Sequence, residues 1–399
     1  MSFQDLLELD RLARQDGKGY TSQRYLYSRL ASRPGRHFVG IVGPRGVGKT
    51  VLLKQLASES SQSFYLSLDM LEDSEGGDLF EIAKRLVERY GVKLLLVDEI
   101  HFDRKFHQKL KAIYDFLDLR IVFTSSVALA LFESAYDLSR RVQLETLYPF
   151  SFREYVYFKT EKDLPRLSLH RIASESEFGE YLRYEDLFED YIRGGLMPFS
   201  LEEPDVLPVL ANIIQTVIRR DIPEIAQLRT DEVASLGKVL NFVGRSAVDG
   251  VNYSSVSRNI GITKYKAEQY IRLLEKAFLL NPVFPAGTNV LREPKVLMYP
   301  PVRLLYRDYP DVLGGLREDF FTLMLRIQGA EFNYLKSTRG SKIPDFLVRD
   351  REGSIVVEIG GRGKGHEQFK GISEKKRLIL THSDRIDKMR KPLVLAGFL

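Results

Sequence analysis

An octapeptide near the N-terminus, residues 43–50, constrains this chain more than any other stretch. It reads Gly-Pro-Arg-Gly-Val-Gly-Lys-Thr and follows the apolar run Phe38–Val42. The G-x-x-x-x-G-K-T spacing, between a buried strand and an amphipathic helix, is the pattern of a phosphate-binding P-loop. Glycines let backbone N–H groups converge on phosphate oxygens, and the helix N-terminus adds a favourable dipole. The sequence therefore predicts nucleotide binding; a glycine-rich turn before a core helix is the weaker alternative.

The side chains of the octapeptide have distinct expected roles. Lys49 is expected to reach the β- and γ-phosphates, where it would act in catalysis. Thr50 is expected to place its hydroxyl on Mg²⁺, an ion that keeps several waters and takes few protein ligands. ATP and Mg²⁺ are the predicted cofactors. The residues expected to contact the nucleotide are Gly43, Pro44, Arg45, Gly46, Val47, Gly48, Lys49, Thr50 and Val51.

Apolar strands and amphipathic helices alternate after the octapeptide. Because the connections are short and the strands are apolar on both faces, the pattern predicts an α/β fold with a parallel, doubly wound sheet. This core is expected to span residues 1–150. Further strands are expected at 64–68, 92–97, 120–123 and 142–144, and helices at 78–90, 105–117 and 127–132.

Two acids, Asp98 and Glu99, directly follow the predicted strand 92–97. They stand at its carboxyl end, where open α/β sheets bind ligands. Asp98 is expected to hold Mg²⁺ through water, and Glu99 to orient or deprotonate the attacking water. Two solvated loop acids are the alternative, but their place one helix–strand unit after a P-loop favours catalysis.

Together these motifs resemble those of AAA+-type P-loop ATPases, in particular an archaeal-type prokaryotic group with GPRxxGKT, LLxDE and L-x-P-x-S-F-x-E-Y. The last signature stands at residues 147–155. The resemblance implies a polar sensor, Thr124 or Ser125, and an arginine finger, Arg140 or Arg141, that reaches a neighbouring subunit of a homo-oligomer such as a hexamer. The two arginines can equally cap a helix or pair within the domain. STAND-like signalling relatives need no such finger.

A mostly helical stretch, residues 151–235, follows the core. The resemblance implies that it forms a lid whose segment 194–198, Gly-Gly-Leu-Met-Pro, turns toward the base. Nucleotide contacts are then expected from Gly195 and Pro198. A plain helix stop and turn is the alternative.

Charge is distributed unevenly along the chain. The net charge is +5, but residues 1–235 carry 31 Lys and Arg against 37 Asp and Glu, whereas residues 236–399 carry 28 against 17. This asymmetry favours nucleic-acid binding by the second part, although a solvated basic surface is the alternative.

Two short helices, expected at 254–260 and 264–278, flank Gly261 and the N-cap Thr263 within residues 236–285. With a trailing strand at 279–284 they suggest a helix-turn-helix with a wing. The outward face of its second helix is expected to contact DNA, although winged helices also bind proteins. The candidate contacts are Lys264, Tyr265, Lys266, Gln269 and Arg272.

The remaining residues, 286–399, carry spaced acids that are similar to the PD-(D/E)xK nuclease core. Glu318, Pro344-Asp345 and Glu358 match, which implies a second Mg²⁺ site. The lysine does not match, because Gly360 stands in its place, with Lys364 or Lys370 as substitutes. The tail is therefore expected to cut DNA poorly or not at all.

Absent features narrow the functional class. The chain has no cysteine, which excludes disulfides, thiolate zinc sites and cysteine nucleophiles. No apolar run approaches the roughly 20 residues of a membrane span, so no membrane partner and a cytoplasmic location are expected. Missing cysteine with abundant Lys, Arg and Glu suggests a thermophile. The sequence predicts an ATPase that binds or remodels DNA, branched DNA included. The alternative is a nucleotide-dependent switch that binds protein partners.

Overall fold

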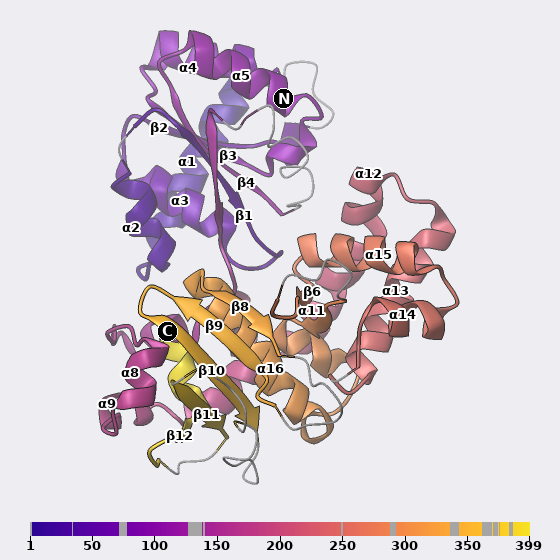
Figure 1. The fold of residues 1–399 in the computed structure, drawn as a ribbon. Coiled ribbons are helices and arrows are strands. Elements are labelled where there is room, and N and C mark those ends of the chain that lie inside the picture. The colour runs from indigo at the N-terminus through magenta and orange to yellow at the C-terminus, as the bar shows by residue number, and fades with distance from the viewer. Residues whose placement is uncertain are drawn as a thin grey trace. The chain divides into compact units, whose positions relative to one another are not determined.

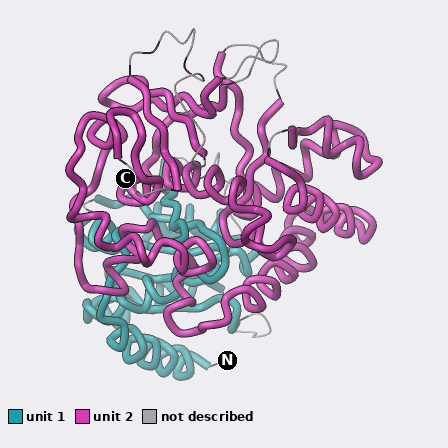
Figure 2. Tube along the Cα trace, turned by 90° about the horizontal axis from the view of Figure 1, so that it is seen from below, with its two compact units in different colours: residues 1–149 teal, residues 150–399 magenta. Residues whose placement is uncertain are grey.

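The computed structural model describes residues 2–399 apart from 34, 72–77, 127–137, 139, 249, 288–292, 336–342, 361–368, 370–373, 375 and 383–385. The expected helix at 127–132 lies outside the described residues, as do Lys364 and Lys370. The chain divides into two compact units, residues 1–149 and 150–399 (Figure 2). Within the described ranges, no helix has both the length and the apolar character needed to cross a membrane.

The first unit alternates strands and helices as the periodicity predicts (Figure 1). Each predicted strand begins and ends within two residues of the observed one. The helices are α1 (Phe3–Gly19), α2 (Tyr25–Ala31), α3 (Lys49–Glu59), α4 (Leu79–Tyr90) and α5 (Phe106–Phe116), and the strands are β1 (Phe38–Val42), β2 (Ser63–Ser67), β3 (Leu94–Asp98), β4 (Arg120–Ser125) and β5 (Val142–Thr146).

The five strands form a parallel sheet in the order β2-β3-β4-β1-β5. Strand β4 lies between β1 and β3, with Val42 beside Ser125 and Val97 beside Phe123. The carboxyl ends of parallel strands share one edge, so the P-loop, the Asp98-Glu99 pair and the end of β4 meet there. The predicted α/β fold with a parallel sheet is confirmed.

Helix α1 packs against the rest of the first unit. It begins at a capping box, in which the Ser2 hydroxyl accepts from the Asp5 amide and the Asp5 carboxylate accepts from the Ser2 amide. It packs against α3 and β2. A side chain at Gly17 would overlap the Lys54 carbonyl of α3, so this glycine lets the two helices approach closely.

The second unit begins with helices and ends with a sheet. Its helices are α7 (Phe152–Thr160), α8 (Leu169–Ser174), α9 (Gly179–Leu182), α10 (Leu187–Asp190), α11 (Val206–Thr216), α12 (Ile222–Ala226), α13 (Thr230–Arg245), α14 (Tyr253–Ile260), α15 (Lys264–Lys276) and α16 (Tyr309–Gln328). Its strands are β6 (Leu280–Val283), β7 (Lys295–Met298), β8 (Glu331–Tyr334), β9 (Phe346–Asp350), β10 (Gly353–Gly360), β11 (Arg377–Thr381) and β12 (Arg390–Pro392).

The C-terminal sheet has the order β12-β11-β10-β9-β8 and is mixed. Strands β8, β9 and β10 pair antiparallel, whereas β10, β11 and β12 pair parallel. The 3₁₀ segment Leu393–Phe398, which follows β12, packs on α7, where the rings of Phe152 and Phe398 are 5.3 Å apart. The Leu167 amide, just before α8, donates to the Phe398 carbonyl at 2.8 Å. The division of residues 150–399 at 235 and 285 stays a prediction.

A buried ion pair joins several elements of the second unit. Arg303, in the 3₁₀ turn Pro300–Leu305, donates to both carboxylate oxygens of Asp319 on α16, at 2.6 and 3.1 Å. The two side chains are 2% and 0% exposed. Arg303 also donates to the Val243 carbonyl of α13 at 3.2 Å, and Asp319 accepts from the Met298 amide of β7 at 3.0 Å. The pair therefore connects α13, β7 and α16.

Candidate nucleotide site

The P-loop has the backbone that its glycines predict. Gly46 and Gly48 have φ of +82° and +85°, in the left-handed region that favours glycine. A side chain at Gly43 would overlap the Leu147 carbonyl oxygen. Leu147 in turn donates its amide to the Val42 carbonyl at 2.8 Å. The start of the 147–155 signature is thus packed directly under the P-loop, which gives the signature a structural role.

Arg24, just before α2, ties the loop to the same signature. Its buried guanidinium donates to the Val47 carbonyl at 2.8 Å and to the Tyr148 carbonyl at 2.8 Å. Hydrogen bonds from a charged donor are stronger than neutral ones. Arg24 therefore holds the P-loop in shape from outside the motif, and no sequence pattern marks this arginine.

Lys49 and Thr50 open helix α3, where the motif predicts them. The Lys49 ammonium is 5% exposed and donates to the carbonyls of Gly43 and Pro44 at 2.9 and 3.0 Å. The Thr50 hydroxyl hydrogen-bonds the Asp98 carboxylate. Hydroxyl and carboxylate oxygens are the hard ligands that Mg²⁺ accepts, so these two residues fit the ion that the motif implies.

Asp98 ends β3 and is 3% exposed. The Tyr65 hydroxyl donates to its Oδ2 at 2.9 Å, and the Thr124 hydroxyl donates to its Oδ1. Burial raises the pKa of Asp98, and the charge of Glu99 adds to that effect, whereas the hydrogen bonds from Thr124, Thr50 and Tyr65 oppose it. The carboxyl is therefore firmly oriented, and it is harder to ionise than an ordinary aspartate.

Glu99 follows in a left-handed conformation, with φ of +50° and ψ of +55°, which is costly for a residue other than glycine. Its amide donates to the Thr124 hydroxyl at 3.0 Å. Its carboxylate accepts from the Ser126 amide and hydroxyl, both at 2.9 Å, and lies 3.2 Å from the His101 Nδ1. These contacts hold the Glu99 carboxylate against Ser126 and His101.

The pKa of Glu99 lies below its ordinary value, the opposite direction to that of Asp98. Burial alone would raise the pKa, but the charges of Lys49 and His101 and the two hydrogen bonds from Ser126 outweigh it. Glu99 is therefore ionised at neutral pH and available as a base or as an acceptor for water.

The end of β4 places three successive hydroxyl residues against this acid pair. Thr124 contacts both acids, Ser126 contacts Glu99, and the Ser125 hydroxyl lies 3.2 Å from the His101 Nδ1. Of the two sensor candidates, Thr124 is thus the one that contacts the acids. Sequence reasoning missed Tyr65, His101 and Ser126 as site residues. Only the last two had a signal, namely their position beside a motif.

The two finger candidates differ in their surroundings. The Arg141 guanidinium pairs with the Asp115 carboxylate of α5 at 3.0 Å. Arg140 is exposed. The alternative of pairing within the domain therefore describes Arg141, and the finger stays a prediction for Arg140.

Gly195 and Pro198, the predicted lid contacts, lie in the second unit. A side chain at Gly195 would come within 2.8 Å of the Tyr155 ring, and Pro198 begins the 3₁₀ turn Pro198–Leu201. Turns precede α10, which leads into the π-helical turn Tyr191–Gly195. The glycine thus has a packing role, and its contact with nucleotide stays a prediction.

Helices α14 and α15 form the expected pair. Gly261 ends α14 with φ of +74°, and the Thr263 hydroxyl accepts from the Lys266 amide at the start of α15. Strand β6 pairs antiparallel with β7. The three cations predicted to contact DNA have acidic partners: Lys264 pairs with Glu293, Lys266 with Glu232 at 3.4 Å, and Arg272 with Glu268 at 2.6 Å. Tyr265 and Gln269 are exposed.

The three acids of the expected second metal site have other contacts. Glu318 pairs with Lys295 of β7 at 2.6 Å, and Asp345 accepts from the Ile359 amide at 2.7 Å. Glu358 is fully buried in β10. Across the described part of the chain, no group of three or more His, Cys, Asp or Glu residues could hold a metal ion. The Mg²⁺ site of Glu318, Asp345 and Glu358 therefore stays a prediction.

Two parts of the chain match known domain families. Residues 35–156 match the family described as AAA domain. Residues 185–299 match a domain family of unknown function, DUF8612. With the site geometry, the first match supports an AAA-type P-loop ATPase.

The chain is also similar to individual proteins. The uncharacterized protein MJ1637 of Methanocaldococcus jannaschii is 27% identical over 371 residues, which cover 84% of this chain and 77% of that protein. The Walker-type ATPase PABY2304 of Pyrococcus abyssi aligns over 72% of this chain and 93% of its own, with 13% identity and a TM-score of 0.41. The Hsp104–ADP complex of S. cerevisiae aligns over 66% and 41%, with 16% identity and a TM-score of 0.33.

Proposed function

We propose that the first unit hydrolyses ATP in the presence of Mg²⁺. The observation that carries the proposal is the hydrogen bond between Thr50 of the P-loop and Asp98 of β3. It brings the two expected ligands of one Mg²⁺ together from separate elements, beside the buried Lys49. The match of residues 35–156 to the AAA domain family supports the same activity.

Each side chain has a task in this reaction. P-loop amides and the Lys49 ammonium would bind the phosphates and stabilise the charge that grows on them. Mg²⁺, when bound, would neutralise phosphate charge and orient the γ-phosphate. Glu99 is ionised and can accept a proton from water or align it for attack. Both hydrogen bonds from Ser126 go to Oε2 of Glu99, which links the catalytic base to the end of β4.

Replacement of Glu99 separates binding from chemistry. Glu99→Gln should keep nucleotide affinity and lose hydrolysis by about 10² to 10⁴-fold, since one positioned acid–base group contributes that much. Lys49→Ala should lose nucleotide binding. Glu88→Gln, on the exposed side of α4, is the matched control and should resemble the wild type. Phosphate release and binding of a fluorescent ATP analogue measure the two effects, and full turnover by Glu99→Gln would refute the assignment.

We further propose that the second unit binds DNA through α15. The helix pair α14–α15, the antiparallel β6–β7 pair that follows it and the excess of positive charge in residues 236–399 support this proposal. The ion pairs on α15 set a condition for this proposal, because a phosphate must compete with an acid for each cation. Exposed ion pairs contribute at most about 1 kcal/mol, so phosphates can replace them.

Salt dependence tests this second proposal on the full-length protein. Lys264→Ala and Lys266→Ala should each weaken duplex binding and reduce the slope of log affinity against log salt by about 0.9, the value for one lost phosphate contact. Lys84→Ala, which removes an equal charge from exposed α4, should leave the slope unchanged. Absence of any DNA binding at low salt would favour the alternative, a nucleotide-dependent switch that binds protein.

A further inference from the structure

Tyr65 lies outside every motif, yet its side chain contacts the centre of the nucleotide site. It belongs to β2, an edge strand that pairs with β3, and its ring is buried. Its hydroxyl donates to Asp98 Oδ2 at 2.9 Å, while Thr124 donates to Oδ1. Both oxygens of the acid therefore have a donor of fixed position, one from each neighbouring strand.

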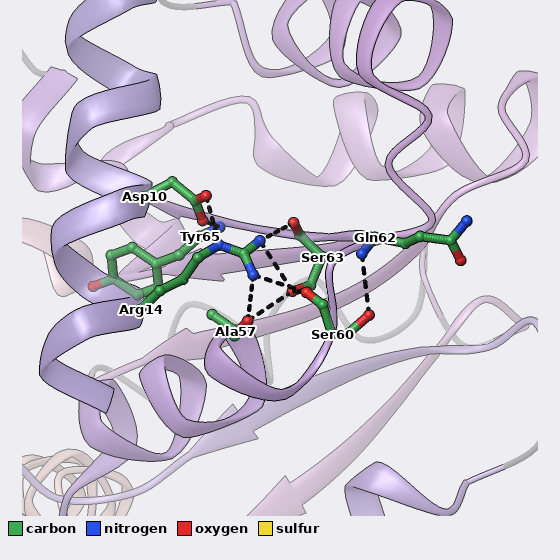
Figure 3. Close-up of polar contacts among 7 residues, drawn as sticks. All are labelled: Asp10, Arg14, Ala57, Ser60, Gln62, Ser63 and Tyr65. Carbon is green, nitrogen blue, oxygen red and sulfur yellow. Dashed lines mark hydrogen bonds and ion pairs between the residues drawn. The ribbon is translucent and has the colours of Figure 1, made fainter. Parts of the chain in front are cut away.

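Helix α1 holds the backbone of Tyr65 in place (Figure 3). The Asp10 carboxylate accepts from the Tyr65 amide at 2.7 Å, and so supplies an acceptor on the open edge of β2. Arg14, one turn later, donates to Asp10 at 2.7 Å. Its guanidinium also donates to the carbonyls of Ala57 and Ser60, at 2.5 and 2.8 Å, and to that of Ser63. Two α1 side chains thus connect the end of α3 to the start and middle of β2.

We propose that Tyr65 is a positioning residue of the ATPase site, which orients Asp98 for Mg²⁺ and which Asp10 and Arg14 of α1 hold in register. This inference rests on the proposed ATP hydrolysis and extends it to a strand and a helix outside the motifs. Residues that orient a metal ligand affect metal affinity and activity by roughly 10 to 100-fold when they are removed.

The Tyr65 hydroxyl is a donor that stays neutral. Burial raises the pKa of Tyr65 far above its ordinary value, and the charge of Asp98 adds to this, so the phenol keeps its proton. Loss of the hydroxyl would leave Asp98 Oδ2 without this donor, so the acid should be oriented less firmly for Mg²⁺.

The variant Tyr65→Phe removes the hydroxyl and keeps the ring. It should raise the Mg²⁺ concentration for half-maximal hydrolysis by roughly tenfold. Nucleotide binding without Mg²⁺ should not change, because P-loop contacts remain. Tyr114→Phe, on α5, removes the same hydroxyl in the same unit and is the matched control. An unchanged Mg²⁺ requirement in Tyr65→Phe would overturn the proposal.

Variants of α1 test whether Asp10 holds Tyr65 in register. Asp10→Ala should raise the Mg²⁺ requirement in the same direction as Tyr65→Phe and add little to it in the double variant, because both act through one side chain. Glu8→Ala, which breaks an exposed pair with Arg11 on the same helix, should match the wild type. Additive effects of Asp10→Ala and Tyr65→Phe would refute a shared route. If the wild type proves not to hydrolyse ATP, the Mg²⁺ dependence of nucleotide binding still separates the variants, so the two proposals can fail independently.

Discussion

At the scale of single residues, the site depends on two adjacent carboxyl groups with opposite behaviour. Asp98 and Glu99 are both largely buried, yet burial dominates the pKa of the first, whereas Lys49, His101 and Ser126 lower the pKa of the second. The difference arises from the left-handed backbone at Glu99, which directs its side chain to other partners. One group is therefore suited to hold a cation, and the other to remain an anion facing water.

The raised pKa of Asp98 predicts that the pH dependence of ATP hydrolysis changes with the Mg²⁺ concentration. Because burial raises the pKa of Asp98, this acid takes up its proton at a higher pH than an ordinary aspartate, and Mg²⁺ binding is lost with it. Higher Mg²⁺ concentrations should therefore shift the acid limb of the ATPase profile to lower pH, since metal and proton compete. Hydrolysis rates measured over pH at several Mg²⁺ concentrations check this. If the acid limb does not shift with the Mg²⁺ concentration, the loss of activity at low pH arises from a group other than Asp98.

At the scale of elements, the sequence predicted the first unit well, and the reasons are physical. Parallel strands buried on both faces are continuous apolar runs, so β1, β3 and β4 were found within two residues. Contacts between strands were not readable, because they depend on strand order. Tyr65 reaches Asp98 only because β2 lies beside β3, and Thr124 contacts the acids because β4 lies between β1 and β3. Periodicity carries no information on either point.

In the second unit, too, the sequence predicted local structure but not contacts between residues that are far apart in the chain. Its helix pair α14–α15 was predicted from a turn glycine and an N-cap, which are local signals. Phe152 packs on Phe398, and Glu318 pairs with Lys295. These partners are far apart in the sequence, so no local sequence pattern predicts either contact. The predicted second metal site illustrates this: the spacing of its acids was visible in the sequence, but the pairing of Glu318 with Lys295 was not.

We expect the stability of the second unit to depend strongly on the buried Arg303–Asp319 pair. Asp319→Ala should destabilise it by about 3–5 kcal/mol, because it leaves a buried guanidinium without its counter-charge. Asp311→Ala, on the same helix α16, breaks a pair with Arg307 whose side chains are 39% and 58% exposed, and should cost about 0.5 kcal/mol or less. Urea unfolding followed by circular dichroism measures both. ATP with Mg²⁺ should move only the transition of the first unit, which tells the two transitions apart. Equal losses in the two variants would contradict the role of the buried pair.

At the scale of the whole molecule, the open question is whether one chain completes its own ATPase site. Lys49, Asp98, Glu99 and Thr124 all come from the first unit, and so do the residues that position them. The predicted finger is the one catalytic group without a place in this arrangement. Arg141 is engaged by Asp115, whereas Arg140 is exposed directly before β5. An exposed arginine there suits a contact with the nucleotide of a second copy, which is the geometry that a homo-oligomer would need.

The pair Arg140 and Arg141 therefore offers a matched test of catalysis between subunits. An arginine supplied in trans can contribute roughly 10³-fold or more to the rate. If Arg140 is that group, specific activity should rise with protein concentration, and Arg140→Ala should lower turnover while it leaves ATP binding intact. Mixing Arg140→Ala with the hydrolysis-deficient Glu99→Gln protein should restore activity, because a Glu99-bearing site can then receive Arg140 from its neighbour. Arg141→Ala should instead lower thermal stability through the lost Asp115 contact, with little effect on turnover per folded molecule. Activity that is independent of concentration, with no recovery on mixing, would show that each chain hydrolyses ATP alone, as a monomeric switch does.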